Sequence, residues 1–246
     1  SITTVNNSLV VVEVSLNGNA DLDFNASLSL SGDSLTWVKQ ASRQQTDSNN
    51  YTGCIATFTA LVTTGATFNL VADCGAESVY SYKVSVWYYT GHDTTTPVGA
   101  TASDDSASTA SLTLTLSATP AETSGIIAGH ESVVFETSSV APGATYTEIY
   151  DNYHTDGFQA LQVQRRTTGS TSTGVDWGAI TGTGSFQRRL GVAIEVKEAA
   201  GAAAGQPTSK RHGGVPFVAM PGRGNVWAPV LRSPMLIGPS SMRAAC

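Results

Sequence analysis

Two glutamates, Glu131 and Glu136, are the best candidates for catalytic chemistry in this sequence. A glycoside hydrolase needs two carboxylates that flank one bond, and many such enzymes are all-β proteins. These glutamates are five positions apart, and an odd spacing turns two side chains of a regular strand toward opposite faces. They would share a substrate only at a bulge. We therefore expect strand-end or outward-facing carboxylates and rank a jelly-roll glycosidase third among the possible functions.

Other catalytic and metal-binding patterns are missing from the sequence. The four histidines are scattered, at His92, His130, His154 and His212. There is no Cys-x-x-Cys, no His-Glu-x-x-His, no Gly-x-Ser-x-Gly and no phosphate-binding Gly-x-x-x-x-Gly-Lys-Ser/Thr motif, which are the usual marks of zinc, serine-hydrolase and nucleotide chemistry. We expect no catalytic residue, no metal and no cofactor, and hence a protein that is not an enzyme.

Three short pairs of polar residues allow weaker hypotheses. Asp21-Leu22-Asp23 would place two carboxylates on one strand face, and Asp104-Asp105 falls in a Ser-rich turn, so either pair could take part in a calcium site. Solvated turns are the favoured interpretation of both. His92-Asp93 follows an aromatic segment, and we expect these side chains to fix a turn, because no nucleophile accompanies them.

The three cysteines, Cys54, Cys74 and Cys246, are too few for a disulfide scaffold. Cys54 and Cys74 fall in neighbouring predicted strands and could be cross-strand neighbours. We favour free, buried thiols over a disulfide.

The elements that position these residues are predicted to be strands, since apolar and polar residues alternate in short windows that turn-forming residues separate. The windows are Leu9–Leu16, Asp21–Leu30, Leu35–Gln40, Cys54–Leu61, Thr67–Asp73, Tyr80–Thr90, Ala110–Leu116, Ser124–Glu136, Thr145–Tyr150, Gln159–Arg166 and Ser185–Lys197. No amphipathic helix is evident before residue 198. The pattern predicts an all-β, jelly-roll-like antiparallel sandwich of roughly eleven strands, and it favours one sandwich over two because no repeat is apparent.

Charge divides the chain into unequal parts. All 19 acidic residues lie in residues 1–198 with 8 basic residues, whereas residues 199–246 hold 5 basic residues and no acid. The last regular strand ends near Lys197, and the small residues that follow resemble a linker. We therefore predict a sandwich domain over 1–198, a linker over 199–209 and an extended arm over 210–246.

The arm combines basic and apolar residues with frequent Pro and Gly. Proline disfavours both a helix and a central strand, yet the segment is too apolar for a solvated tail, so we expect it to lie extended against its own sandwich or a neighbouring chain. The residues predicted to dock it are Lys210, Arg211, Phe217, Arg223, Trp227, Leu231, Arg232, Leu236 and Ile237. Five bases over 48 residues argue against nucleic acid, and the acidic sandwich of another copy is a natural partner.

Several phrases resemble a known class of protein. They are Tyr89-Thr-Gly-His-Asp93 with Pro97-Val-Gly-Ala100, Leu161-Gln-Val-Gln-Arg-Arg166 with Ser170-Thr-Ser-Thr173 and Val175-Asp-Trp177, and Gly191-Val-Ala-Ile-Glu-Val-Lys197. Together they resemble the β-sandwich structural proteins of tailed bacteriophages, of the minor tail, head-decoration or neck-associated type. The resemblance implies a non-enzymatic component of a virion, with other virion proteins and copies of itself as partners and no catalytic residues.

A second functional hypothesis is a carbohydrate-binding module or adhesin. Aromatic rings at Trp37, Tyr51, Trp87 or Trp177 would stack on the sugars of a host surface glycan. Sugar-binding rings would be exposed in one cluster, whereas structural rings would be buried. We expect neither a membrane span nor a signal peptide, because the sequence has no apolar run of the required length and no basic segment at its start.

Overall fold

The computed structural model describes residues 1–19, 22–32, 34–46, 51–75, 79–106, 112–134, 138–153, 159–167, 169–182 and 186–199, together with the backbone of residues 217–218 and 225–227. These residues form eighteen strands and one helix of four residues. The all-β prediction is thereby confirmed. Among the described residues, no helix has the length and apolar character that a transmembrane segment needs.

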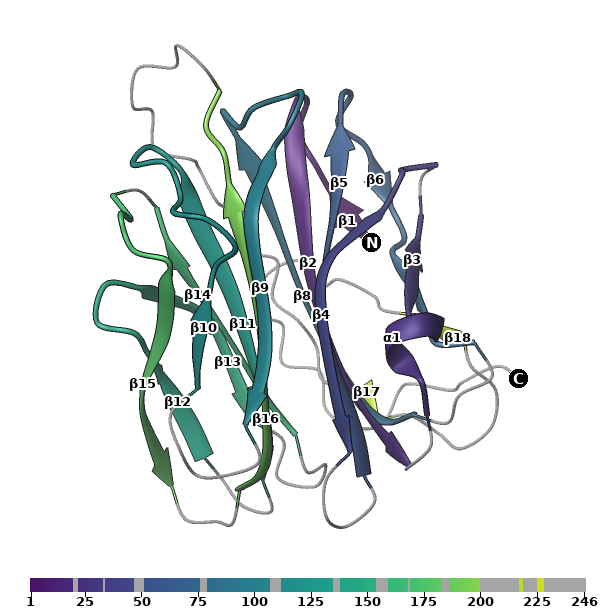
Figure 1. Cartoon of the computed structure of the whole chain (residues 1–246). Coiled ribbons are helices and arrows are strands. Elements are labelled where there is room, and N and C mark those ends of the chain that lie inside the picture. The colour runs from purple at the N-terminus through teal and green to yellow at the C-terminus, as the bar shows by residue number, and fades with distance from the viewer. Residues whose placement is uncertain are drawn as a thin grey trace.

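Two five-stranded antiparallel sheets form the centre of the molecule (Figure 1). The first central sheet has the order β17 (Phe217–Val218), β8 (Val79–Thr90), β2 (Ser8–Asn19), β5 (Tyr51–Val62) and β4 (Val38–Thr46). The second central sheet has the order β13 (Thr147–Tyr153), β14 (Ala160–Arg166), β11 (Gly125–Val134), β16 (Phe186–Val196) and β9 (Val98–Ser106).

Smaller sheets cover the outer face of each central sheet (Figure 1). Outside the first lie β18 (Asn225–Trp227), β7 (Val71–Asp73) and β3 (Ser29–Ser31), the pair β1 (Ile2–Thr3) and β6 (Thr67–Phe68), and helix α1 (Phe24–Ser27). Outside the second lie β10 (Thr113–Thr115), β15 (Gly174–Gly182) and β12 (Ser138–Pro142). The molecule is therefore a stack of four layers, one more on each side than the two-sheet sandwich that the sequence suggested.

Three apolar cores separate these layers, and β2 shows how the sequence produces them. Its residues Val10, Val12 and Val14 pack into the core beneath the outer sheet, while Leu9 and Val11 pack into the core between the central sheets. Successive side chains of a strand point to opposite faces. A strand that is buried between two cores is therefore apolar at both its odd-numbered and its even-numbered positions.

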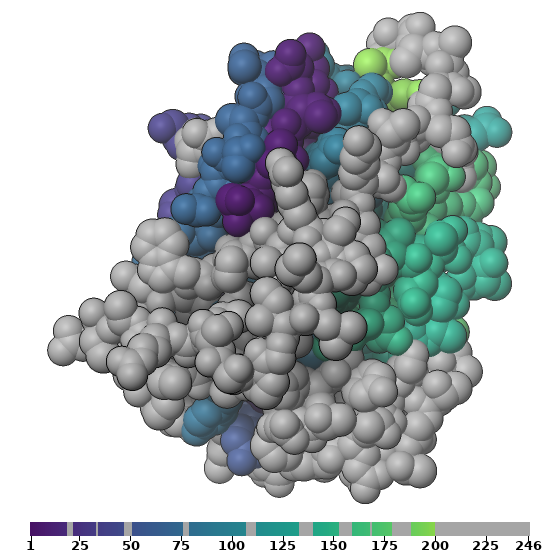
Figure 2. All heavy atoms as spheres, turned by 180° about the vertical axis from the view of Figure 1, so that it is seen from behind, coloured from purple at the N-terminus to yellow at the C-terminus, as the bar shows by residue number. Residues whose placement is uncertain are grey.

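The two central sheets come from different parts of the sequence. Strands β2, β4, β5 and β8 of the first lie before residue 91, and all five strands of the second lie after residue 97. Figure 2 shows this separation on the rear of the molecule, where purple and blue atoms gather on one side and teal and green atoms on the other. Among the described strands, β17 and β18 are the two that bring later residues back to the first half, through pairing with β8 and β7.

Some elements differ from those predicted. The window Asp21–Leu30 contains α1 and β3 rather than one strand, because the Asp23 carboxylate accepts a hydrogen bond from the Ala26 backbone N–H (3.1 Å) and caps a helical turn. Strands β9, β12 and β15 were not predicted, since Gly, Ser, Asp and Pro interrupt their alternation.

Candidate functional site

The layer between the two central sheets has an apolar half and a polar half. The apolar half comprises the core residues between the sheets, which include Leu9, Val11, Ile55, Trp87, Ile127, Leu161, Val163, Leu190, Val192 and Ile194. Further along the same strands the inward positions become polar, and these residues form the polar half: Glu13, Ser15, Asn17, Thr57, Ser81, Lys83, Ser85, Glu131, Gln159 and Arg188. All ten are buried. We take the polar half as the candidate functional site.

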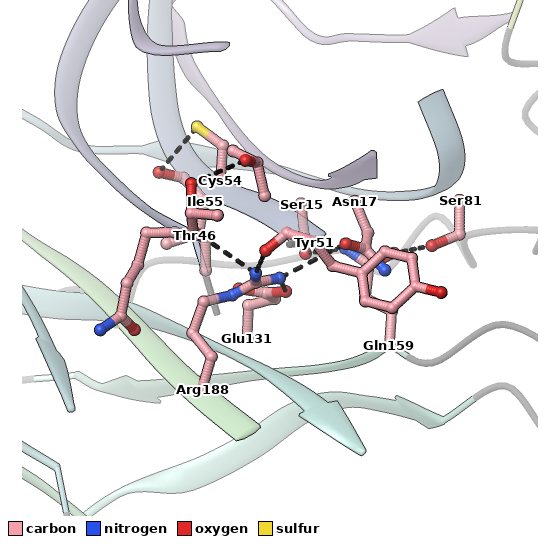
Figure 3. Close-up of polar contacts among 12 residues, drawn as sticks. Ser15, Asn17, Thr46, Tyr51, Cys54, Ile55, Ser81, Glu131, Gln159 and Arg188 are labelled. Carbon is pink, nitrogen blue, oxygen red and sulfur yellow. Dashed lines mark hydrogen bonds and ion pairs between the residues drawn. The ribbon is translucent and has the colours of Figure 1, made fainter. Parts of the chain in front are cut away.

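An ion pair between Arg188 and Glu131 lies at the centre of the polar half (Figure 3). Arg188 Nη2 lies 3.2 Å from Glu131 Oε1, and both side chains are fully buried. Arg188 Nη1 also donates to the backbone carbonyls of Gln45 (3.0 Å) and Tyr51 (2.7 Å) on the first central sheet. A charged residue of β16 thus joins its own sheet to the edge of the opposite one, as planar guanidinium donors allow.

Gly53 provides the space that the guanidinium occupies. A Cβ atom at Gly53 would lie 1.8 Å from Arg188 Nη2 and 2.3 Å from Arg188 Cζ. Any larger residue would therefore displace the arginine. Glycine at this position is required by close packing against a side chain rather than by a turn.

Gln159 forms a second link between the central sheets (Figure 3). Its Nε2 atom donates to Ser15 Oγ, and its Oε1 atom accepts from Ser81 Oγ at 2.9 Å. Ser15 and Ser81 belong to β2 and β8, whereas Gln159 directly precedes β14. One amide therefore satisfies two hydroxyl groups that would otherwise be buried at a cost.

Glu13 is a carboxyl group that lies fully buried in the middle of β2. Both of its oxygens lie 2.9 Å from Thr57 Oγ1, and a Cβ atom on Gly129 of the opposite sheet would lie 3.0 Å from Oε2. Burial raises the pKa of Glu13 to about 8, although the hydrogen bond from Thr57 acts in the opposite direction. The group is consequently protonated at neutral pH.

Lys83 is the buried cation of β8, with a side chain that is 3 % exposed. Its Nζ atom donates to the backbone oxygen of Asn152 (3.1 Å) and to Asn152 Oδ1 (3.2 Å) on the opposite sheet. Burial lowers the pKa of Lys83 to about 8, against the attraction of the Asp151 and Glu131 charges. The neutral amine is therefore the minor form near physiological pH, but far more populated than for an ordinary lysine.

A separate polar cluster lies on the outer face of the second central sheet. The His130 ring lies 5.3 Å from the Trp177 ring, and Trp177 Nε1 donates to Gln162 Oε1 at 2.6 Å. Burial lowers the pKa of His130 to about 3, with a further contribution from the charge of Arg189. A neutral, enclosed histidine packed on tryptophan is a structural element of the core rather than an acid–base catalyst.

A hollow opens at the edge of the apolar half, where β8 ends and β11 begins. It encloses about 450 Å³ including its open mouth, and Tyr89, Ile127 and Val196 form part of its apolar wall. Arg165 and Lys197 also line it. The hollow is small, and it contains no pair of carboxylates that would suit hydrolysis.

Among the residues considered for catalysis, those that the structure describes do not assemble into a site. The prediction of a strand-end or outward-facing carboxylate is wrong for Glu131. This side chain is buried against Arg188, because the inward face of β11 is polar at this point. Glu136 lies outside the described residues. His92 and Asp93 do fix a turn: Asp93 Oδ1 accepts from the backbone N–H of Thr95 (2.7 Å) and Thr96 (2.9 Å), and His92 Nδ1 lies 3.2 Å from the Tyr89 carbonyl.

The residues considered for metal binding are also dispersed. Within the described ranges, no group of three or more His, Cys, Asp and Glu side chains could hold a metal ion. Asp104 and Asp105 lie in strand β9 rather than in a solvated turn, because both pair with β16, and Asp105 forms an ion pair with Arg43. Asp21 lies outside the described residues. Cys54 and Cys74 are buried free thiols, as predicted.

The four aromatic residues considered for glycan binding do not share one surface. Trp87 and Trp177 are buried, and each indole N–H donates to a neighbouring side chain, Ser85 Oγ and Gln162 Oε1 respectively. Trp37 packs against the core of the first half. Tyr51 is half-buried, with its ring centroid 6.0 Å from that of Tyr80, which is 45 % exposed.

The arm is described only where its backbone forms β17 and β18. Phe217 and Val218 pair with Tyr82 and Ser81 on β8, and the strand Asn225–Trp227 pairs with β7. Both additions are edge strands, which suits a segment rich in proline. The other predicted docking residues lie outside the described part: Lys210, Arg211, Arg223, Leu231, Arg232, Leu236 and Ile237.

Sequence reasoning overlooked the polar half, although β2 and β8 contain a signal for it. The inward positions of β2 run Leu9, Val11, Glu13, Ser15, Asn17, and those of β8 run in the opposite direction as Tyr89, Trp87, Ser85, Lys83, Ser81. Since the two strands pair antiparallel with Ser15 opposite Lys83, the inward positions of both strands change from apolar to polar at the same point along the sheet.

Comparison of the chain with protein families, curated proteins and solved structures finds no match.

Proposed function

We propose that this chain is a non-enzymatic structural subunit of a bacteriophage particle, with the C-terminal arm as the segment that docks neighbouring subunits. The observation that supports this proposal best is the pairing of β17 with β8, in which a two-residue strand of the arm extends an edge of a central sheet. Strand addition at a sheet edge is a common mode of recognition between chains. A two-residue strand that follows the last strand of the sandwich, β16, by 20 residues of sequence suits exchange between copies.

The closed character of the polar half agrees with a structural role. Arg188 and Lys83 are buried and donate hydrogen bonds across the two central sheets, and Glu131 pairs with Arg188 within the second sheet, so a substrate would have to separate the sheets to reach them. Side chains that link two layers add rigidity, whereas an active site needs access. The sequence phrases that resemble tailed-phage virion proteins supply the reason for naming a phage particle rather than another assembly.

Disulfide trapping tests the arm. One protein would carry Phe217→Cys and another Tyr82→Cys, both with Cys246→Ser to remove the C-terminal thiol. Mixing the two under oxidising conditions should give a disulfide between chains, because these positions face each other in the β17–β8 pair. Leu61→Cys, at an exposed position on β5, replaces Tyr82→Cys as the matched control. A third protein would carry both cysteines in one chain. A disulfide that forms within this protein but not between the two mixed proteins would contradict exchange.

Removal of residues 200–246 supplies the second test. We expect a folded sandwich that stays monomeric at concentrations where the full chain self-associates, as measured by sedimentation velocity and circular dichroism. Loss of folding would show that the arm belongs to the core. Equal self-association of both proteins would contradict docking through the arm.

A glycan-binding role is the second candidate, and the exposed ring of Tyr80 beside Tyr51 favours it. A glycan array would test it with the full chain. Binding that is lost in Tyr80→Ala but retained in Trp37→Ala would support a sugar site at this pair. Absence of binding, or equal loss in both variants, would reject it.

A further inference from the structure

Lys83 and Asn152 bring an amine and a carboxamide into contact between the two central sheets. The amine nitrogen lies 3.2 Å from Asn152 Oδ1, and that oxygen is bonded to Cγ, the carbon that a nucleophile would attack. Two reacting groups that the fold holds next to each other gain a large advantage over the same groups on free molecules. The second hydrogen bond, to the Asn152 backbone oxygen (3.1 Å), keeps the amine in place.

The surroundings favour the nucleophilic form of the amine. Lys83 is buried on the inward face of β8, between Ser81 and Ser85 at the flanking inward positions. Its pKa of about 8, described above, leaves roughly a tenth of the amine uncharged at pH 7 and about half at pH 8. Lysine amines activated by burial in this way are established nucleophiles toward carbonyl carbon.

A carboxylate that can carry a proton lies in the same row of residues. The strand registers align Glu131, Leu161 and Asn152 side by side on β11, β14 and β13. Because Leu161 packs into the layer between the central sheets, the row faces Lys83. The ion pair with Arg188 holds the Glu131 carboxylate in position, and the charge of Glu131 acts on the Lys83 amine.

We propose that Lys83 and Asn152 form an intramolecular isopeptide bond that joins the two central sheets. The neutral Nζ atom attacks Cγ of Asn152, and a carbon–nitrogen bond forms. The bond between Cγ and Nδ2 breaks, and Nδ2 leaves as ammonia. Glu131 takes a proton from the attacking amine and delivers it to the leaving nitrogen, as a general acid–base catalyst does. No oxidant, metal or other reactant is consumed.

The bond would close a loop between residues that are 69 positions apart. It would also link the half of the chain before residue 91 to the half after residue 97. A covalent connection of this kind restricts the unfolded chain and so stabilises the folded one. The proposal does not depend on the phage assignment, since it concerns one chain and needs no partner.

Mass spectrometry of the full-length, denatured protein tests the bond. We expect a mass lower than that of the 246-residue sequence by one molecule of ammonia, and a branched peptide that contains both Lys83 and Asn152 after proteolysis. Asn152→Ala and Lys83→Met should each have the full mass of their own sequences. Asn152→Asp should lose one molecule of water instead, since a carboxyl group releases water in the same reaction.

Two results would overturn the proposal. One is a wild-type mass equal to that of the sequence, which needs no variant and does not depend on assembly. The other is an ammonia loss that persists in Asn152→Ala, because it would then arise elsewhere in the chain. Glu131→Gln, checked for folding by circular dichroism, should keep its full mass, and cross-linking at the wild-type extent in this variant would contradict the role given to Glu131.

Discussion

The apolar and polar halves of the central layer belong to the same strands, yet they join the two sheets in different ways. In the apolar half, side chains such as Leu161 and Val192 pack closely and gain stability without regard to direction. In the polar half, Arg188, Lys83 and Gln159 each bond to particular atoms of the opposite sheet. We infer from this difference that apolar packing stabilises the contact between the sheets, while the hydrogen bonds of the polar half determine how one sheet is aligned with the other.

The largest expected effect comes from removing one partner of the buried ion pair. Arg188→Met would leave Glu131 buried without its cation, and we expect the free energy of unfolding to fall by about 3–5 kcal/mol. Urea denaturation of both proteins measures this. In an Asn152→Ala background, where no Lys83–Asn152 cross-link can form, the double variant Arg188→Met with Glu131→Met should recover most of the loss caused by Arg188→Met alone, since it buries no charge. An Arg188→Met variant as stable as the wild type would show that Arg188 does not help to hold the two sheets together.

A cavity in the apolar half should cost a similar or slightly smaller amount. Leu161→Ala removes a fully buried side chain, and we expect a loss of about 2–5 kcal/mol in urea denaturation. Leu61→Ala is the matched control, because Leu61 is 41 % exposed on β5 and its truncation should change stability by less than about 0.5 kcal/mol. Equal effects at the two positions would mean that the central sheets do not pack tightly here.

The buried carboxyl of Glu13 should make stability depend on pH. The unfolded chain releases this proton near its ordinary pKa of 4.5, whereas the folded chain retains it up to about pH 8. Stability should therefore fall as the pH rises through this window, by up to about 1.4 kcal/mol per pH unit.

Glu13→Gln isolates this slope. His130, with a pKa lowered to about 3 from 6.5, produces a rise in stability with pH between those values and partly opposes Glu13 in the wild type. The difference between wild type and Glu13→Gln, from urea denaturation at several pH values, removes that contribution. A constant difference between pH 4.5 and pH 8 would show that Glu13 is ionised in the folded protein.

The smallest effect is expected at the exposed counterpart of the buried ion pair. Arg43 on β4 pairs with Asp105 on β9, and its side chain is 43 % exposed. Water screens such a pair, so Arg43→Met should cost less than about 1 kcal/mol. Thermal denaturation alongside Arg188→Met makes the comparison direct. If Arg43→Met lowers stability as much as Arg188→Met does, the Arg43–Asp105 pair also helps to align the two central sheets.

The sequence predicted much of the fold because local alternation determines strands such as β2, β5, β8 and β14. It failed where a local interaction competed, as in the turn of helix capped by Asp23, and where small polar residues weaken the pattern, as in β9. The polar half lies beyond local reasoning. Glu131 and Arg188 are 57 positions apart, and only the packing of one sheet on another shows that both point inward.

The division of the central sheets between two consecutive stretches of sequence has a consequence for synthesis. A ribosome that has released residues 1–90 has released β2, β4, β5 and β8 of the first sheet, but none of the second sheet that covers Leu9, Val11, Ile55 and Trp87. Nascent domains generally fold as units from the N-terminus. The growing chain would thus expose an adhesive apolar face until β11, β14 and β16 emerge, and a pause in translation there would favour capture by chaperones or by the same face of another nascent chain.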